Sequence, residues 1–142
     1  MATTVFVSGH LDLTKEEFAE HYVPRLQLAL ARGCDFVVGD AHGCDFMVQR
    51  WLREHGATCT VFHMFDRPRH SFGSGYGSHD PNLPKESWSG PRGGFPLRGG
   101  FQSDDQRDSA MTACSQEDIA WVRPGREGSG TARNVRRREA IT

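Results

Sequence analysis

The chain has 142 residues, of which 37% are hydrophobic, and its formal net charge is −1. This length fits one domain spanning 1–142, the near-neutral charge excludes a broadly basic nucleic-acid coat, and no apolar run reaches the length of a membrane span. The start of the chain lacks the layout of a signal peptide, and the four cysteines form no CxxC pair. We therefore expect reduced thiols and a cytoplasmic protein.

Strands and helices alternate in the first half of the sequence. Short β-branched and aromatic runs predict three strands, at residues 5–7, 36–38 and 58–64. Thr14 and Glu17 match a capping box and predict the start of a helix, which Pro24 must either kink or divide. Apolar residues at helical spacing between Cys44 and Leu52 predict a second helix. This alternation with short links is typical of parallel βαβ units.

The regular pattern stops at Phe65. Residues 65–104 are dense in Gly, Ser, Pro and Arg, and contain Arg-Gly-Gly-Phe twice, at 92–95 and 98–101. A loop this long is either a functional lid or disordered. We interpret it as a flap over the binding site, with a featureless insertion as the alternative. Two copies of the repeat are too few to indicate RNA binding.

The last third of the sequence predicts a helix over 105–114, a strand over 119–122 and a helix that begins near Thr131. The turn before this last helix, 125–130, is rich in glycine. A strand that feeds a glycine-rich loop and a helix N-terminus can hold an anion, because the first helical N–H groups have no internal acceptor. Ser129 and Thr131 add hydroxyl donors there. The alternative is a plain strand–helix turn.

These elements together predict an α/β fold: a Rossmann-like, three-layer α/β/α domain with a mainly parallel sheet. Right-handed crossovers give the strand order 3-2-1-4, with the long insertion before the last strand. Ligands in such sheets bind beyond the carboxyl ends of the strands, where the strand order reverses. Three glycine-marked loops are expected to meet there, at residues 8–10, 39–45 and 125–131.

Three motifs of this sequence resemble the SLOG superfamily, the Rossmann-like group that contains the Lonely Guy phosphoribohydrolases, the YpsA-like proteins and the DNA-processing protein A family. Arg107, Met111 and the strand led by Asp118 are similar to a Lonely Guy motif. Pro124-Gly125 and Gly128-Ser129-Gly130-Thr131 resemble a stretched form of its PGGxGT phosphate loop. Residues 39–45, GDAHGCD, resemble the SGxARGxD loop of the DNA-processing proteins. The motifs cover both ends of the chain and miss the insertion.

The resemblance implies a nucleoside phosphate in the crevice, with its phosphate on the loop 128–131 and with Arg107 in contact with phosphate or ribose. Because relatives often associate, it also implies a homodimer. One position departs from the pattern: the phosphoribohydrolases carry a catalytic Glu three residues after the loop threonine, and this chain has Asn134. An amide cannot act as a general base. Asp40, Asp45 or Glu127 would replace it only if the fold brings one of them to the sugar.

The predicted ligand-binding set combines the three loops with the residues implied by the resemblance: Ser8, Gly9, His10, Gly39, Asp40, Gly43, Asp45, Arg107, Gly125, Gly128, Ser129, Gly130, Thr131 and Asn134. The catalytic candidates are Arg107 and Asp45. Asp45 either holds a ribose hydroxyl or caps the second helix, and Arg107 is either a phosphate clamp or a solvated helix residue. We predict no metal site, because His42 and Cys44 lack ligand spacing, and no cofactor.

Three functions follow as hypotheses. The first is an N-glycosidase or deoxyribosyl-transfer enzyme acting on nucleotides. The second, motivated by Asn134, is a non-catalytic sensor or carrier of a nucleotide-derived ligand. The third is a single-strand nucleic-acid binder, which the near-neutral net charge makes the weakest of the three.

Overall fold

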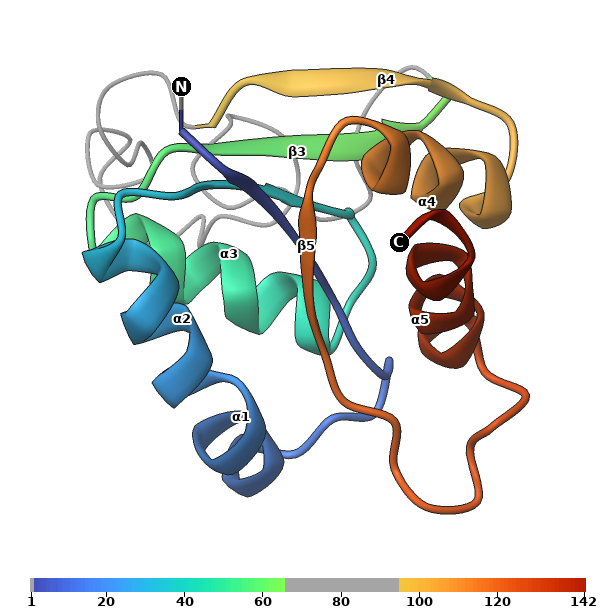
Figure 1. Ribbon diagram of the computed structural model, residues 1–142, viewed down its shortest axis with the longest axis horizontal. Helices are drawn as coiled ribbons and strands as arrows, with labels where there is room; N and C mark the ends of the chain where they lie inside the picture. The colour runs from blue at the N-terminus through green and yellow to red at the C-terminus, as the bar shows by residue number, and fades with distance from the viewer. Residues whose placement is uncertain (1, 66–94) are drawn as a thin grey trace, which may run out of the picture.

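The computed structural model describes residues 2–65 and 95–142 and contains one parallel sheet of five strands in the order β4-β3-β2-β1-β5 (Figure 1). The strands are β1 Thr4–Ser8, β2 Asp35–Val38, β3 Cys59–Met64, β4 Leu97–Phe101 and β5 Glu117–Ala120. Every pairing within the sheet is parallel. The predicted α/β class is therefore confirmed.

In the described part of the chain, five helices cover the two faces of this sheet (Figure 1). They are α1 Lys15–His21, α2 Val23–Ala31, α3 Cys44–Glu54, α4 Asp104–Ala113 and α5 Gly130–Ile141. Helices α1, α2 and α3 lie on one face over the larger apolar core, and α4 and α5 lie on the other. The smaller core under α4 consists of Phe6, Val37, Phe62 and Met111. None of the described helices is long and apolar enough to cross a membrane.

The first helical region confirms the predicted capping box and resolves the question of Pro24. The hydroxyl of Thr14 accepts a hydrogen bond from the Glu17 N–H at 3.1 Å, and the Glu17 carboxylate accepts one from the Thr14 N–H at 2.9 Å. Pro24 divides the region rather than kinking it, because it stands in the first turn of α2, where its missing N–H has no helical acceptor to lose.

The strand order agrees with the prediction for four strands and differs by one additional strand. The predicted neighbours appear as β3, β2, β1 and β5, but β4 lies outside β3 and falls within the predicted insertion 65–104. The sequence did not predict this strand because it contains Gly99 and Gly100, and glycine is depleted in strands. Gly99 is nonetheless required, since a Cβ there would lie 2.0 Å from Cε1 of His63. The flap hypothesis now concerns 66–94, outside the described residues.

The last strand also begins and ends two residues earlier than expected, at Glu117–Ala120 instead of 119–122. It ends where Trp121 turns its N–H away from the sheet and donates to the phenol oxygen of Tyr22 at 3.1 Å. The Tyr22 hydroxyl in turn donates to the carbonyl of Ser8 at 2.7 Å. Tyr22 therefore joins the exits of β1 and β5, the two strands that flank the switch in strand order.

Candidate functional site

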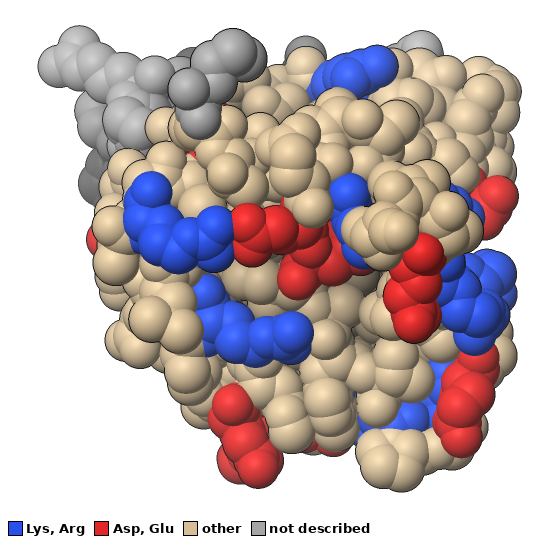
Figure 2. Space-filling model, in the orientation of Figure 1, with Lys and Arg blue, Asp and Glu red and all other residues tan. Residues whose placement is uncertain are grey.

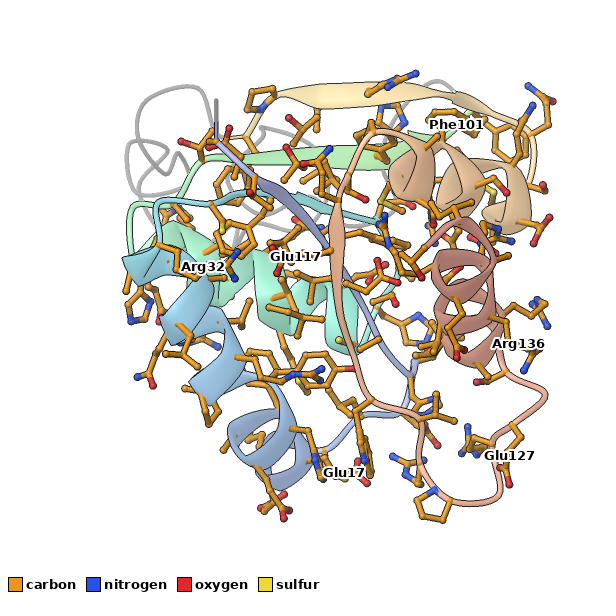
Figure 3. The ribbon with its side chains drawn as sticks, in the orientation of Figure 1. Glu17, Arg32, Phe101, Glu117, Glu127 and Arg136 are labelled. Carbon is orange, nitrogen blue, oxygen red and sulfur yellow. The ribbon has the colours of Figure 1, made fainter. Side chains whose placement is uncertain are left out.

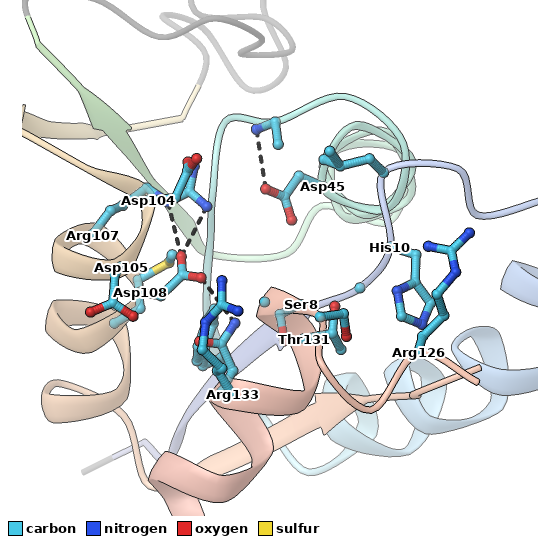
Figure 4. Close-up of a pocket in the computed structure, with 18 of the residues that line it drawn as sticks. Ser8, His10, Asp45, Asp104, Asp105, Arg107, Asp108, Arg126, Thr131 and Arg133 are labelled. Carbon is cyan, nitrogen blue, oxygen red and sulfur yellow. Dashed lines mark hydrogen bonds and ion pairs between the residues drawn. The ribbon is translucent and has the colours of Figure 1, made fainter. Parts of the chain in front are cut away.

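A cavity of about 570 Å³ opens beyond the carboxyl ends of β1 and β5, between the α4 and α5 helices and the loop that precedes α3 (Figure 4). The three loops predicted to meet all contribute to its wall. The lining residues are Phe6, Ser8, Gly9, His10, Leu11, Asp12, Ala41, His42, Asp45, Asp104, Asp105, Arg107, Asp108, Met111, Arg126, Ser129, Gly130, Thr131, Arg133 and Asn134.

One wall of the cavity is the first turn of α5. Ser129 is the N-cap, and its hydroxyl accepts a hydrogen bond from the Ala132 N–H at 3.2 Å. Helix geometry leaves the N–H groups of Gly130 and Thr131 without an intrahelical acceptor, at the positive end of the helix dipole. Ser8 lines the same cavity as Thr131 and is 6% exposed (Figure 4), and its hydroxyl has no hydrogen-bond partner among the described residues.

Two arginines border this helical end of the cavity, and neither belongs to the predicted set. Arg133 donates from Nη1 to the carbonyl of Gly128 at 3.1 Å, and no described carboxylate forms an ion pair with it. Arg126 pairs through Nη2 with Oδ2 of Asp12 at 2.6 Å. The sequence spacing could have predicted Arg133 as a cavity residue. It lies three residues after Gly130 and therefore on the same helical face, one turn later.

The opposite end of the cavity is acidic and is organised by Arg107, which is only 5% exposed. Its Nη1 lies 2.7 Å from Oδ1 of Asp40 and 3.2 Å from Oδ1 of Asp104. Its Nε and Nη2 donate to Oδ1 of Asp108 at 3.0 and 2.9 Å. Burial alone would disfavour the charged guanidinium, but the surrounding carboxylates, Asp45 among them, raise the pKa of Arg107. Arg107 is therefore positively charged, and the neighbouring carboxylates already balance its charge.

Asn134, where the resemblance would place a catalytic glutamate, is held in the same network. Its Nδ2 donates to Oδ2 of Asp108 at 3.0 Å, and its Oδ1 accepts from Nη1 of Arg137 at 2.6 Å. Both polar ends of the buried amide are thus engaged. A glutamate here would bring a second negative charge toward Asp108, so the amide suits the network where a carboxylate would be repelled.

Asp45 is the buried carboxylate in the wall that retains unused acceptor capacity. Its Oδ2 accepts from the Ala41 N–H at 3.1 Å, and Oδ1 has no hydrogen bond from any residue that the structure describes. Burial, first of all, raises the pKa of Asp45 to about 7, with Asp108 and Asp40 adding to the rise and Arg107 opposing it. A carboxyl that titrates near neutral pH in a cavity can exchange a proton with a ligand. The Ala41 contact orders the loop before α3, so Asp45 both fixes that loop and lines the cavity.

His10 is buried against the cavity in a neutral state. Its Nε2 accepts a hydrogen bond from the Arg123 N–H at 2.9 Å, which places the ring proton on Nδ1. Burial, and after it the charges of Arg123 and Arg126, lower the pKa of His10. His10 therefore ties the loop after β1 to the loop after β5 and adds no positive charge to the site.

The structure brings most of the predicted ligand-binding set to the cavity. Nine members line it: Ser8, Gly9, His10, Asp45, Arg107, Ser129, Gly130, Thr131 and Asn134. The other five are not among the lining residues: Gly39, Asp40, Gly43, Gly125 and Gly128. Gly39 permits the close approach behind Asp45, because a Cβ there would lie 2.6 Å from Oδ2 of Asp45 and 2.8 Å from Cζ of Arg107.

Within the described residues, no group of three or more His, Cys, Asp or Glu side chains is arranged to hold a metal ion. No protein-family model, curated protein or solved structure matches this chain.

Proposed function

We propose that the cavity binds a nucleoside 5′-monophosphate, with the phosphate on the first turn of α5. The observation that carries this proposal is the buried, unpartnered hydroxyl of Ser8, which lines the same cavity as Thr131. Leaving a buried hydroxyl without a partner costs about 1–3 kcal/mol, and an anion on the helix would accept its hydrogen bond. The N–H groups of Gly130 and Thr131 and the uncompensated charge of Arg133 support the same position.

The acidic end of the cavity supports a sugar beyond the phosphate. Across the cavity from Ser8 and Thr131, Asp45 offers an acceptor oxygen for a hydroxyl (Figure 4). The volume of about 570 Å³ falls within the range for small-molecule sites, roughly 300–1,000 Å³. A ligand that is anionic at one end and rich in hydroxyl donors at the other matches both walls.

Cleavage of the N-glycosidic bond is a second candidate function, favoured by the proton that Asp45 carries near neutral pH. As the C1′–N bond breaks, its electron pair stays with the base, which takes the Asp45 proton. Water then adds to C1′ and returns a proton to the Asp45 carboxylate, giving free base and a sugar phosphate. The locked amide of Asn134 favours instead a sensor or carrier that binds without chemistry.

A screen of nucleoside mono- and diphosphates, read by melting temperature and by release of free base, tests these functions together. We expect at least one monophosphate to raise the melting temperature, because binding to the native state alone stabilises it, and the matching nucleoside to have a smaller effect. If no nucleotide changes the melting temperature, the proposal is refuted. Base release that is lost in D45N supports the enzyme, and binding without release supports the sensor.

Arg133→Gln supplies the sharper test, with Arg136→Gln as its matched control. Both residues lie on α5 and donate to backbone carbonyls of the preceding loop, Arg133 to Gly128 and Arg136 to Glu127. Figure 3 shows Arg136 on α5 and Glu127 in that loop, and Arg136 does not line the cavity as described. We expect R133Q to weaken monophosphate binding about tenfold, as for loss of a charged hydrogen bond, and R136Q to change it little. If R133Q and R136Q weaken monophosphate binding equally, the positive charge of α5 as a whole, and not Arg133 in particular, attracts the phosphate.

The nucleic-acid and dimer hypotheses are less well supported by this geometry. Acidic and basic side chains are interspersed over the face shown in Figure 2, without a broad basic patch. Steeply salt-dependent retention of a single-stranded oligonucleotide would favour the nucleic-acid binder. The homodimer stays a prediction, for which light scattering is the direct measurement.

A further inference from the structure

We propose that Arg126 is a transferable phosphate ligand, which Asp12 holds in the free protein and which a phosphate on the first turn of α5 takes over. The inference rests on the proposed function and adds a binding residue and a competitor to it. Both residues line the cavity, and Figure 4 shows Arg126 on the side opposite Arg107 and Asp108.

The backbone of Arg126 is fixed beside the helical anion position. Its N–H donates to the carbonyl of Arg123 at 2.9 Å, and its carbonyl accepts from the N–H of Ser129, the N-cap of α5, at 3.0 Å. The side chain is 43% exposed, and its ion pair with Asp12 is the single one it forms among the described residues. Rotation of the side chain alone can therefore redirect the guanidinium without moving the loop.

Asp12 can release Arg126 because a second arginine stays with it. Arg123 lies 3.1 Å from Oδ1 of Asp12 through Nη1 and donates from Nη2 to the Asp12 carbonyl at 3.2 Å. The same guanidinium contacts the Glu17 carboxylate at 2.6 and 2.9 Å. Hydrogen bonds from Arg126 and then Arg123 lower the pKa of Asp12, so it is a charged carboxylate with two cationic partners.

The exchange is favourable on general grounds. Exposed ion pairs such as Arg126–Asp12 contribute little to stability, since both side chains are solvated and lose entropy on pairing. A phosphate held by helix amides is a multidentate acceptor that matches the planar guanidinium. Arg107 is poorly placed for such a move, because its guanidinium is buried and forms ion pairs with Asp40, Asp104 and Asp108. Of Arg107 and Arg126, it is therefore the exposed Arg126 that can exchange its partner for a ligand.

A double-mutant cycle measures the transfer, with inorganic phosphate as the probe in calorimetric titrations in a phosphate-free buffer. We expect R126Q to weaken phosphate binding about fivefold, because a charged donor is lost. We expect D12N to tighten it about threefold, because a competitor for Arg126 is weakened. In the R126Q background, D12N should give no gain, since there is no arginine left to release.

Two charge-matched controls accompany the cycle. Glu16→Gln removes a negative charge from the first turn of α1, and Arg136→Gln removes a positive charge from α5 outside the cavity wall. Neither should change phosphate affinity by more than about twofold, as for solvent-screened charges. Melting temperatures confirm that each variant is folded, and the Arg123–Glu17 contacts remain to hold the loop in D12N.

Each outcome decides the proposal. Wild-type protein that binds no inorganic phosphate overturns the transfer, and the nucleotide screen then decides separately whether the proposed function fails with it. Phosphate binding that R126Q and D12N leave unchanged overturns the transfer alone. A D12N gain that persists in the R126Q background shows that Asp12 acts by direct repulsion of the anion, which also overturns the transfer.

Discussion

The two ends of the cavity hold arginines in opposite circumstances. Arg107, on α4, is 5% exposed and has Asp40, Asp104 and Asp108 around it. Arg133, on α5, is exposed and has a backbone carbonyl but no described carboxylate as partner. One cation is enclosed by more negative charge than it carries, and the other is left open to the cavity.

This difference separates an arginine that maintains the fold from one that can receive a ligand. A phosphate approaching Arg107 would meet several carboxylates first, whereas a phosphate at α5 would meet helix amides and an uncompensated cation. Arg107 is the arginine that the resemblance selects as a phosphate or ribose contact. We infer that it acts as a positioning residue, which holds Asp108 and, through its charge, moderates the proton affinity of Asp45.

The largest effect is expected from Arg107→Met, which removes the buried cation and keeps an apolar stem. Asp40 is fully buried and Asp108 nearly so, and both carboxylates would lose their ion pair with Arg107 in the folded state. We expect the free energy of unfolding to fall by about 3–5 kcal/mol, as for breaking one side of a buried ion pair. Urea denaturation followed by circular dichroism measures this loss.

Arg32→Met is the matched control for that loss. Arg32 pairs with Glu117 at 2.6 Å, between α2 and β5 (Figure 3), but the side chains are 53% and 44% exposed. Solvent screens such a pair, so we expect a change below about 1 kcal/mol. Similar losses in the two variants would mean that Arg107 is not the organising cation of the acidic end.

Asp45→Asn is expected to have the second-largest effect, with a sign that depends on pH. The pKa of Asp45 is about 7 in the folded protein and 3.8 in the absence of these interactions, so the folded state binds the proton more tightly. The wild-type free energy of unfolding therefore falls as pH rises from about 4 to about 7 through this group, by roughly 1.4 kcal/mol for each pKa unit of difference.

The D45N variant lacks this pH dependence of the free energy of unfolding, because an amide does not ionise. Its side-chain oxygen can still accept the hydrogen bond from the Ala41 N–H. We expect D45N to gain stability relative to wild type as pH rises from 4 to 7, and to hold that gain at pH 8. Urea denaturation at each pH measures the difference. A difference that is constant from pH 4 to 8 would show that Asp45 keeps an ordinary pKa.

The fold was largely predictable because its determinants are local. The capping box of Thr14 and Glu17 predicts the first helix, and the β-branched and aromatic runs predict β1, β2 and β3. The strand β4 was missed since its identity comes from a non-local contact: Gly99 lies against the ring of His63, and no pattern within 97–101 contains that information. Tertiary contact overrides the low strand propensity of glycine there.

Of the site, the loops were predictable, and the charges around them were not. Strand ends marked by glycine indicated where Ser8 and Thr131 would meet. The partners of Arg107 were hidden, because Asp40 lies 67 positions away in the sequence and reaches it only through the sheet order. Whether an arginine is compensated depends on such pairs, so the sequence alone could not separate Arg107 from Arg133.

The smallest effects are expected from replacing two buried serines, one of which should affect ligand binding and the other the stability of the fold. Both Ser8 and Ser115 are 6% exposed, but Ser115 donates to the Met111 carbonyl at 2.6 Å and accepts from Arg138, whereas the Ser8 hydroxyl has no partner among the described residues. We expect S8A to leave the free energy of unfolding within about 0.5 kcal/mol of wild type, or to raise it, since no hydrogen bond is lost.

In the same comparison, S8A should weaken phosphate binding about threefold to tenfold, for loss of one hydrogen bond to an anion. S115A should do the reverse: it should lower the free energy of unfolding by about 1–2 kcal/mol and leave phosphate affinity unchanged. Urea denaturation and calorimetric titration with inorganic phosphate measure both quantities on both variants. If S8A binds phosphate as wild type does, the hydroxyl of Ser8 does not contact the anion, and the position of the phosphate on α5 loses its main support.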